Sequence, residues 1–192
     1  MASQSLLSWN RDSAQELVEI VAAHVAVGGS GRGRRFATVQ INHAYAVMLS
    51  SQFQRFCRNL HTESADRISR AVAQPTINSM LRRRLIENRK LDVGNPNPGN
   101  LGGDFGRFEI AFWPAVLAHD PRNLVRQRKL EHLNNWRNAI AHQHFDPAAL
   151  GGRTRLSLAG VTDWRAACDG LVVSFDQVMC SHLAAMLGAP PW

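Results

Sequence analysis

Cysteine, lysine and tyrosine are scarce in this sequence of 192 residues, which contains three cysteines, two lysines and one tyrosine. Cys57, Cys168 and Cys180 are widely spaced and lie within apolar helical patterns. They therefore predict neither a disulfide framework nor a zinc cluster, and they fit a reducing cytoplasm. No Gly-Lys-Ser or Gly-Lys-Thr step is present, which argues against a nucleotide-binding P-loop. We expect no metal and no other cofactor.

Long apolar runs and strand patterns are also missing. No stretch approaches 18 continuous apolar residues, and Met1 to Asn10 lacks the basic and apolar regions of a secretory leader. We therefore expect no membrane contact. There is no sustained alternation of apolar and polar residues and no internal repeat. With 45% apolar residues, the sequence predicts one all-α domain over residues 1–192, a bundle of about five to seven helices.

Positive charge is what the sequence has in excess. Lysine and arginine number 22 against 15 acidic residues, which gives a formal net charge of +7, and 20 of the 22 are arginines. The planar guanidinium group suits the binding of phosphates. The bias therefore favours RNA or another polyanion as a partner, or it reflects a GC-rich genome, and charge alone does not choose between these readings.

Apolar periodicity and capping residues predict where the helices lie. Ser13 to Glu16 forms a capping box, and Met80, Leu81, Leu85 and Ile86 are expected to face inward. Thr162 or Asp163 is expected to cap the last helix, whose buried seam includes Trp164, Phe175 and Met186 and which ends at Gly188. The first predicted helix covers 14–27, and the second covers 38–61 and continues over 66–73. After a restart at Pro75, further helices are predicted over 77–89 and part of 105–118. Asp120 is expected to cap a helix over 121–143, and a long final helix follows.

Two segments read as loops. Residues 28–35 are basic and rich in glycine. They form either a solvated loop or a linker that binds phosphate through its backbone amides and its guanidinium groups, including those of Arg34 and Arg35. Residues 92–104 are rich in glycine, proline and asparagine and are longer than most connections. Phe105 and Phe108 directly afterwards are expected to pin this second loop to the core.

Arg55, Arg58 and His61 are spaced three apart on the long helix that begins near Thr38. On a helix this spacing aligns them as a ridge of cations. The ridge either lines an RNA groove or is a solvated face.

The helix over 121–143 carries the most informative pattern. At about 100° per residue, Leu130, Leu133, Trp136 and Ile140 fall on one side. Glu131, Asn135, Asn138 and His142 fall on the other and form a polar stripe along a core helix. Because Asn138 and His142 are four apart, the amide is placed to hold one imidazole nitrogen and leave the other free.

Arg137 lies on the border between these faces, about 140° around the helix from His142. Its side chain either bends toward the stripe or meets a histidine of a second copy, and the second arrangement requires a dimer. A plainer reading pairs Arg137 with a glutamate and leaves His142 at the helix C-terminus, where a cation is favoured.

An arginine and a histidine together suit RNA cleavage without metal. An imidazole, with an ordinary pKa of about 6.5, acts as acid or base at neutral pH, and a guanidinium holds two phosphate oxygens. Two such pairs across a twofold axis would supply both the acid and the base. The products would be a 2′,3′-cyclic phosphate and a 5′-hydroxyl.

The segment Trp136-Arg137-Asn138-Ala139-Ile140-Ala141-His142 resembles the signature of the HEPN superfamily, and the whole chain is similar to its RiboL-PSP-like branch. The resemblance implies a helical bundle that dimerises to build a shared ribonuclease site, acting as a toxin or defence effector beside an antitoxin or regulatory protein. It implies that Arg137 and His142 are catalytic and that Asn138 orients them. His144 and Asn135, which lie on or next to the same stripe, are our candidates for accessory residues.

One position departs from the pattern of HEPN toxins that are silenced by adenylylation of a tyrosine. The residue two places after the histidine is His144, and the only tyrosine is Tyr45. Control by tyrosine adenylylation is therefore not expected. His144 also stands at a permitted spacing from Arg137, so the reactive imidazole is either His142 or His144. The alternatives to an endoribonuclease are a non-catalytic HEPN-like module that binds RNA or a partner protein, and a purely structural helical subunit.

Overall fold

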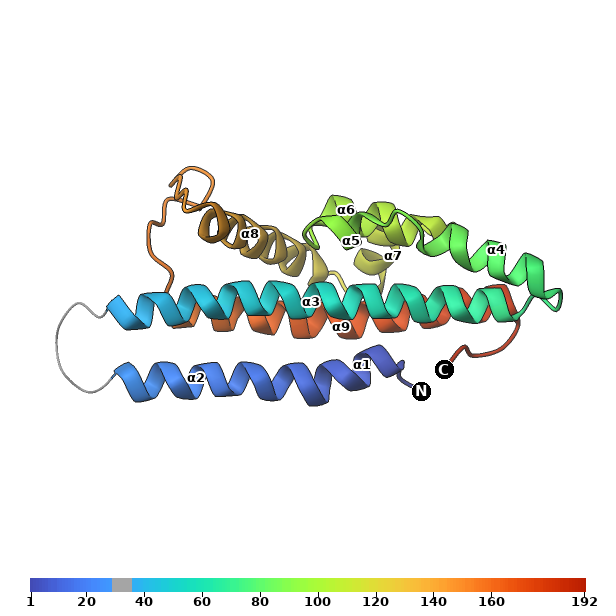
Figure 1. The fold of residues 1–192 in the computed structure, drawn as a ribbon, viewed down its shortest axis with the longest axis horizontal. Coiled ribbons are helices and arrows are strands. Elements are labelled where there is room, and N and C mark those ends of the chain that lie inside the picture. Colours follow the sequence, from blue (N-terminus) through green and yellow to red (C-terminus); the bar gives the residue numbers. More distant parts are fainter. Residues whose placement is uncertain (29–35) are drawn as a thin grey trace.

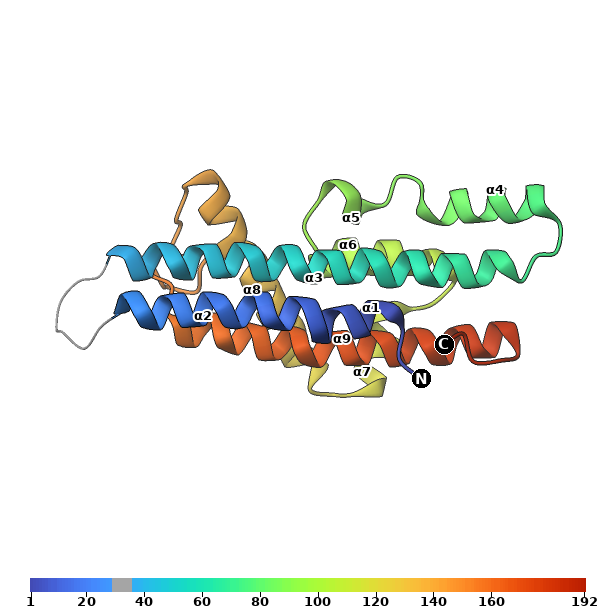
Figure 2. The same ribbon diagram turned by 60° about the horizontal axis from the view of Figure 1, so that its bottom comes forward.

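The structure is a computed structural model that describes residues 1–28 and 36–192, and this part of the chain is 78% helical without any strand. Seven of its helices have seven or more residues, which confirms the predicted all-α bundle. In Figure 1, α3 (Phe36–Arg70) and α9 (Leu158–Leu187) run in parallel as the centre of the molecule. The helix α2 (Ala14–Gly28) lies on one side of this pair and α8 (Asn123–His142) on the other, both antiparallel to α3 (Figures 1 and 2).

The N-terminal helix begins ten residues before the predicted start. The helix α1 (Gln4–Ser8) passes through a π-helical turn at Trp9–Ser13 directly into α2. Ser3 is the N-cap, and its hydroxyl accepts a hydrogen bond from the Leu6 amide at 3.1 Å. The capping box predicted at Ser13 is wrong. Buried Leu6 and Trp9 give the earlier turns their own apolar anchor, and Trp9 packs edge-on against Phe53.

The central helix α3 confirms the predicted long core helix and its continuation, as a single element of 35 residues. Its buried side chains recur on several faces, because α1, α2, α4, α8 and α9 all pack against it. They include Tyr45, Leu49, Phe53, Phe56 and Leu60. A helix surrounded in this way fixes the positions of all its neighbours.

After α3 the chain restarts at Pro75, as predicted. Gln74 caps α4 (Pro75–Ile86) by accepting a hydrogen bond from the Ile77 amide at 2.8 Å. Leu85 is buried as expected, whereas Met80 is 66% exposed, so its predicted inward orientation is wrong. Because α4 packs chiefly on α3, it has only a narrow buried face.

The predicted loop over 92–104 is largely helical. It contains the end of α5 (Lys90–Val93) and most of α6 (Pro98–Phe105). Asn97 caps α6 by accepting from the Asn100 amide at 2.8 Å, and Pro98 takes the first helical position, where proline is tolerated. Gly102 serves close packing rather than a turn, since a Cβ there would lie 3.3 Å from Trp113. Phe105 and Phe108 are buried, as predicted.

The helices that lead to the motif follow. A 3₁₀ turn at Gly106–Phe108 and α7 (Phe112–His119) precede α8, which lies within the predicted range. The cap predicted at Asp120 is wrong, because α8 begins at Asn123 and its N-cap is Arg122, without a side-chain cap hydrogen bond. Asp120 instead accepts a hydrogen bond from the Arg122 amide at 3.0 Å, just ahead of the helix. The side chains of Arg122 and Arg126 hold the pKa of the Asp120 carboxyl below its usual range.

The last helix, α9, is capped by Ser157 rather than by Thr162 or Asp163, because the Ser157 hydroxyl accepts from the Gly160 amide at 3.2 Å. It ends at Gly188, as predicted, with φ of 73°. Met186 is 50% exposed and does not belong to the buried seam. Among the helices of the described residues, α9 alone has the length and apolar composition to cross a membrane. The core helix of a bundle meets the same criteria, and α9 packs against both α3 and α8.

Candidate functional site

The two faces predicted for the motif helix are present in α8. Leu130, Leu133 and Trp136 are at most 1% exposed, and Ile140 is half-buried. The opposite side, with Glu131, Asn135, Asn138 and His142, is exposed. The polar stripe is therefore available to other molecules over about three turns of the helix.

Backbone geometry fixes the residues just beyond the helix. Gln143 adopts the left-handed conformation at φ 53°, and the His144 amide donates back to the Ala139 carbonyl at 3.0 Å. This is a standard way to end a helix. Phe145 then stacks on His43 of α3, with ring centroids 5.5 Å apart. His142 and His144 are thus carried on a segment that is anchored at both ends.

A cleft of about 260 Å³ lies between the end of α8 and the turn that follows it. It brings together four of the predicted site residues, and its lining includes Asn135, Asn138, His142, His144, Asp146 and Leu150. The Asn135 amide donates to the Ala149 carbonyl at 3.4 Å across the cleft. The His142 and His144 side chains have no hydrogen-bond partner among residues 1–28 and 36–192.

Arg137 is partly buried and does not line this cleft. Its Nη1 atom donates to the Asn138 Oδ1 atom at 3.3 Å, and no acidic side chain in the described part of the chain pairs with it. The reading in which Arg137 pairs with a glutamate is therefore wrong within one copy. The remaining guanidinium donors have no partner among the described residues.

Asn138 does not hold His142 in this arrangement. Its Oδ1 atom accepts hydrogen bonds from Arg137 and from the Asn95 Nδ2 atom instead. The predicted contact between Asn138 and His142 is absent from the described residues, because the turn that carries Asn95 lies against this side of the helix. Asn95 was not predicted, and no local pattern could have found it, since the contact joins residues 43 positions apart.

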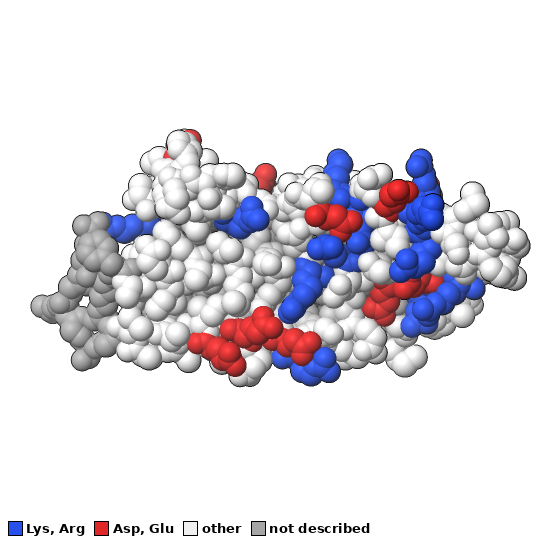
Figure 3. Space-filling view, in the orientation of Figure 1, with Lys and Arg blue, Asp and Glu red and all other residues white. Residues whose placement is uncertain are grey.

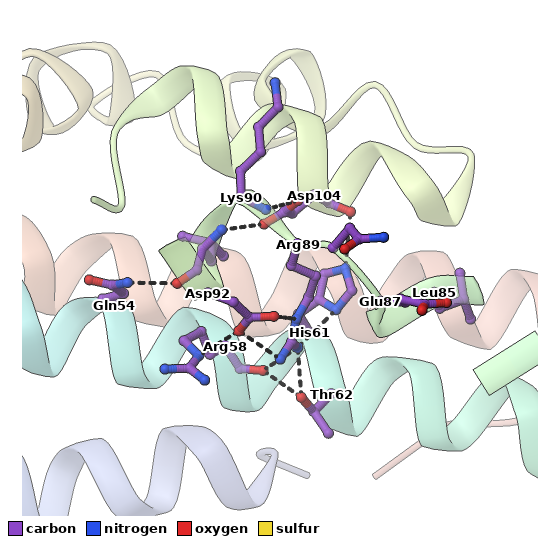
Figure 4. Close-up of polar contacts among 12 residues, drawn as sticks. Gln54, Arg58, His61, Thr62, Leu85, Glu87, Arg89, Lys90, Asp92 and Asp104 are labelled. Atoms are coloured by element: carbon purple, nitrogen blue, oxygen red, sulfur yellow. Dashed lines mark hydrogen bonds and ion pairs between the residues drawn. The ribbon is translucent and has the colours of Figure 1, made fainter. Parts of the chain in front are cut away.

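The predicted cationic ridge on α3 is not continuous. His61 is fully buried, and its Nε2 atom lies 3.0 Å from the Asp104 carbonyl oxygen (Figure 4). Burial lowers the pKa of His61 to about 4, so it is not a surface cation and its place in the ridge was wrong. Arg58 lies 2.9 Å from Asp92, and Arg55 donates to the Ser13 hydroxyl at 3.2 Å. Arg34 and Arg35 fall outside the described residues.

Positive charge is not concentrated at the motif on the face seen in Figure 3. Most Lys and Arg side chains on that face lie over the half that carries α4 and α5, and acidic side chains lie among them. This mixture agrees with the ion pairs that Arg58, Arg82 and Arg89 make with aspartates. Net charge therefore gives no local argument for the candidate site.

No cluster of three or more His, Cys, Asp or Glu side chains suited to a metal ion occurs among the described residues. The three cysteines are free thiols, of which Cys57 and Cys168 are buried. Among the other histidines, His61 and His182 hydrogen-bond to backbone carbonyls, at 3.0 and 2.7 Å. His43 and His132 pack against aromatic rings. The donor groups open to a ligand at the candidate site are therefore imidazole, amide and guanidinium.

Comparisons of the chain with protein-family models, with curated proteins and with solved structures found no match. The resemblance to the HEPN superfamily therefore rests on the residues of the motif and on their all-helical setting.

Proposed function

We propose that this protein is an endoribonuclease that cleaves RNA without a metal ion and acts as a homodimer. The observation that carries the proposal is the cleft at the end of α8, where two exposed imidazoles without partners face an amide, beside a guanidinium that pairs with no carboxylate. This set contains the groups that phosphodiester cleavage needs, because an imidazole can act as acid or base and a guanidinium can hold the charged phosphate oxygens.

The reaction uses the 2′-hydroxyl of the RNA as nucleophile. One imidazole takes the proton from the 2′-hydroxyl, the 2′-oxygen bonds to phosphorus, and the 5′-oxygen leaves with a proton from a second imidazole. The Arg137 guanidinium holds the non-bridging oxygens as their charge increases. The products are a 2′,3′-cyclic phosphate and a 5′-hydroxyl.

A second copy of the chain completes the site in this proposal. Arg137 lies outside the cleft that holds His142, so one copy does not bring both side chains into the same cleft. Two copies of α8 meeting around a twofold axis would supply two imidazoles and two guanidinium groups to one phosphate. The biological role that we propose is that of a cytoplasmic toxin or defence effector, held in check by an antitoxin or another regulatory protein.

The test is cleavage of end-labelled RNA by the purified chain and its variants. Arg137→Ala and His142→Ala should each lower the cleavage rate at least about a hundredfold, because the first removes a cation from the phosphate oxygens and the second removes a general acid or base. The matched controls are Arg128→Ala, an exposed arginine of the same helix, and His119→Ala at the end of α7. His144→Ala decides which imidazole reacts, and EDTA should leave the rate unchanged. Cleavage that survives both Arg137→Ala and His142→Ala would contradict the proposal.

Mixing experiments test the shared site. An excess of the Arg137→Ala/His142→Ala double variant, added to the wild-type chain, should depress its specific activity if each site needs two intact copies. Activity that stays proportional to the wild-type chain present would contradict a shared site.

The second candidate function is an RNA- or protein-binding module that does not cut. The position of Arg137 outside the His142 cleft favours this reading, because a single copy then lacks a complete set of catalytic groups. In that case the same variants would weaken the binding of RNA while no cleavage product appears with the wild-type chain.

A further inference from the structure

The turn at Gly94-Asn95-Pro96-Asn97 is held in place by three amide side chains from three different helices. The Gln54 Nε2 atom on α3 donates to the Gly94 carbonyl at 2.8 Å and to the Leu91 carbonyl at 2.6 Å. The Asn134 Nδ2 atom on α8 donates to the Pro96 carbonyl at 3.1 Å. Asn100 on α6 donates to the Asn95 carbonyl at 2.8 Å.

Two details show that the turn is packed tightly. A Cβ atom at Gly94 would lie 2.8 Å from the Asn100 Nδ2 atom, so glycine is needed for the approach of that side chain. Asn134 is only 3% exposed and also accepts a hydrogen bond from the Ser50 hydroxyl at 3.2 Å. Because buried amides are costly unless they are paired, these contacts specify one position for the turn.

The side chain that this turn presents to α8 is Asn95, whose Nδ2 atom donates to the Asn138 Oδ1 atom. The same oxygen accepts from Arg137 at 3.3 Å. An amide whose oxygen already accepts two hydrogen bonds must turn its NH₂ group the other way. The Asn138 Nδ2 atom has no partner within the described residues, and Asn138 lines the cleft that holds His142.

We infer that Asn95 is a positioning residue for the candidate site: it fixes the Asn138 amide so that an N–H donor faces a phosphate oxygen in the cleft, and it links Arg137 to the same amide. This inference rests on the proposed function for the identity of the ligand, a phosphodiester. The contact itself stands on geometry alone. Asn95 touches no reacting atom and acts only through Asn138.

The experiment is a double-mutant cycle between Asn95→Ala and Asn138→Ala, with Asn59→Ala as the matched control. Asn59 is an exposed asparagine on α3 without a hydrogen-bonded side chain among the described residues. Asn95→Ala should lower kcat/KM about tenfold, the value of one good hydrogen bond. If Asn95 acts through Asn138, the double variant should be no slower than Asn138→Ala alone, whereas independent effects would multiply and overturn the inference.

Two further measurements separate failure of this inference from failure of the proposed function. The side-chain NH₂ resonances of Asn138 in ¹⁵N NMR should move in Asn95→Ala and stay in place in Asn59→Ala, and no movement overturns the contact. The cycle is also measured as Kd for a short 2′-O-methyl RNA, which cannot be cleaved. If Asn95 and Asn138 are coupled in Kd but the wild-type chain cleaves no RNA, the proposed ribonuclease function is wrong and the positioning role of Asn95 stands. If the two residues are coupled in neither the cleavage rate nor Kd, the positioning role is wrong.

Discussion

The polar side chains around Asp104 and those at the end of α8 are arranged in opposite ways. Arg89, His61 and Asp104 are at most 7% exposed, and each has two or more polar partners (Figure 4). His142 and His144 are exposed, and neither side chain has a hydrogen-bond partner in the described part of the chain. Both regions contain histidine, so residue type does not separate them. Burial and the number of partners separate the groups that hold the fold from the exposed groups that a ligand can reach.

The largest difference between the two regions should appear in stability. The Asp104 carboxylate accepts from the Lys90 and Leu91 amides at 2.9 and 2.8 Å. Asp104→Ala leaves both amides unpaired and should lower the free energy of unfolding by about 3 kcal/mol, whereas Asn138→Ala should change it by less than about 0.5 kcal/mol. Urea denaturation measures both. Equal losses at the two positions would remove the distinction between the regions.

The next largest effect is the pH dependence contributed by His61. The Asp104 carbonyl can only accept, so the His61 Nε2 atom carries the proton, and the Nδ1 atom accepts from Arg89 at 3.4 Å. A proton on Nδ1 would face the Arg89 guanidinium in a buried site. The pKa of His61 is therefore lowered from 6.5 to about 4, chiefly by burial.

The sign follows from this lowered pKa. Between pH 6.5 and pH 4, His61 binds a proton in the unfolded chain but not in the folded chain. Its contribution to the free energy of unfolding is therefore fully present above pH 6.5 and falls as the pH drops toward 4. Between pH 7.5 and pH 5 the loss should be about 2 kcal/mol. His61→Gln, which keeps a donor for the Asp104 carbonyl, should lack this part of the pH dependence. The same slope in both proteins would show that His61 is not the group that titrates.

Sequence periodicity predicts the parts of this fold that repeat over many residues. The helices α3, α8 and α9 each have a long apolar pattern, and the two faces of α8 follow from residue spacing alone. The N-terminal turns were missed because their anchors are only Leu6 and Trp9. Residues 92–104 read as a loop because their glycines and asparagines, which often mark turns, serve here for close packing and for capping.

The candidate site likewise has features that the sequence predicts and features that it does not. The presence of Asn135, Asn138, His142 and His144 around one cleft is predictable because all four lie within ten residues of one helix and its end. The place of Asn95 and the burial of His61 depend on contacts with α8 and the 3₁₀ turn, which are distant in sequence. The apolar periodicity of one helix predicts which face a residue occupies, but it does not predict which other element packs on that face.

A smaller effect on stability is expected for Arg58, which is neither buried like Asp104 nor without a partner among the described residues, as His142 is. Its side chain is 46% exposed and lies 2.9 Å from Asp92, a carboxylate that also binds Arg89. Arg58→Ala should therefore lower the free energy of unfolding by less than about 1 kcal/mol, and the difference should shrink in high salt. The same variant tests the predicted RNA ridge. Loss of one phosphate contact would reduce the slope of log Kd against log salt concentration by about one, and an unchanged slope excludes Arg58 from RNA binding.

The smallest effect concerns the backbone that ends α8. Gln143 has φ of 53°, a conformation that favours glycine, and its side chain donates to the Ile140 carbonyl at 2.7 Å. Gln143→Gly relieves the backbone and loses that hydrogen bond, so a net gain of about 0.5 kcal/mol is expected. Asn88→Gly, at φ of 56°, should gain less because asparagine tolerates this conformation. Since the His144 amide and the stacking of Phe145 on His43 both remain, the imidazoles should keep their places and the rate of RNA cleavage should not change. A rate that falls while stability rises would mean that the Gln143 side chain itself helps to set the cleft.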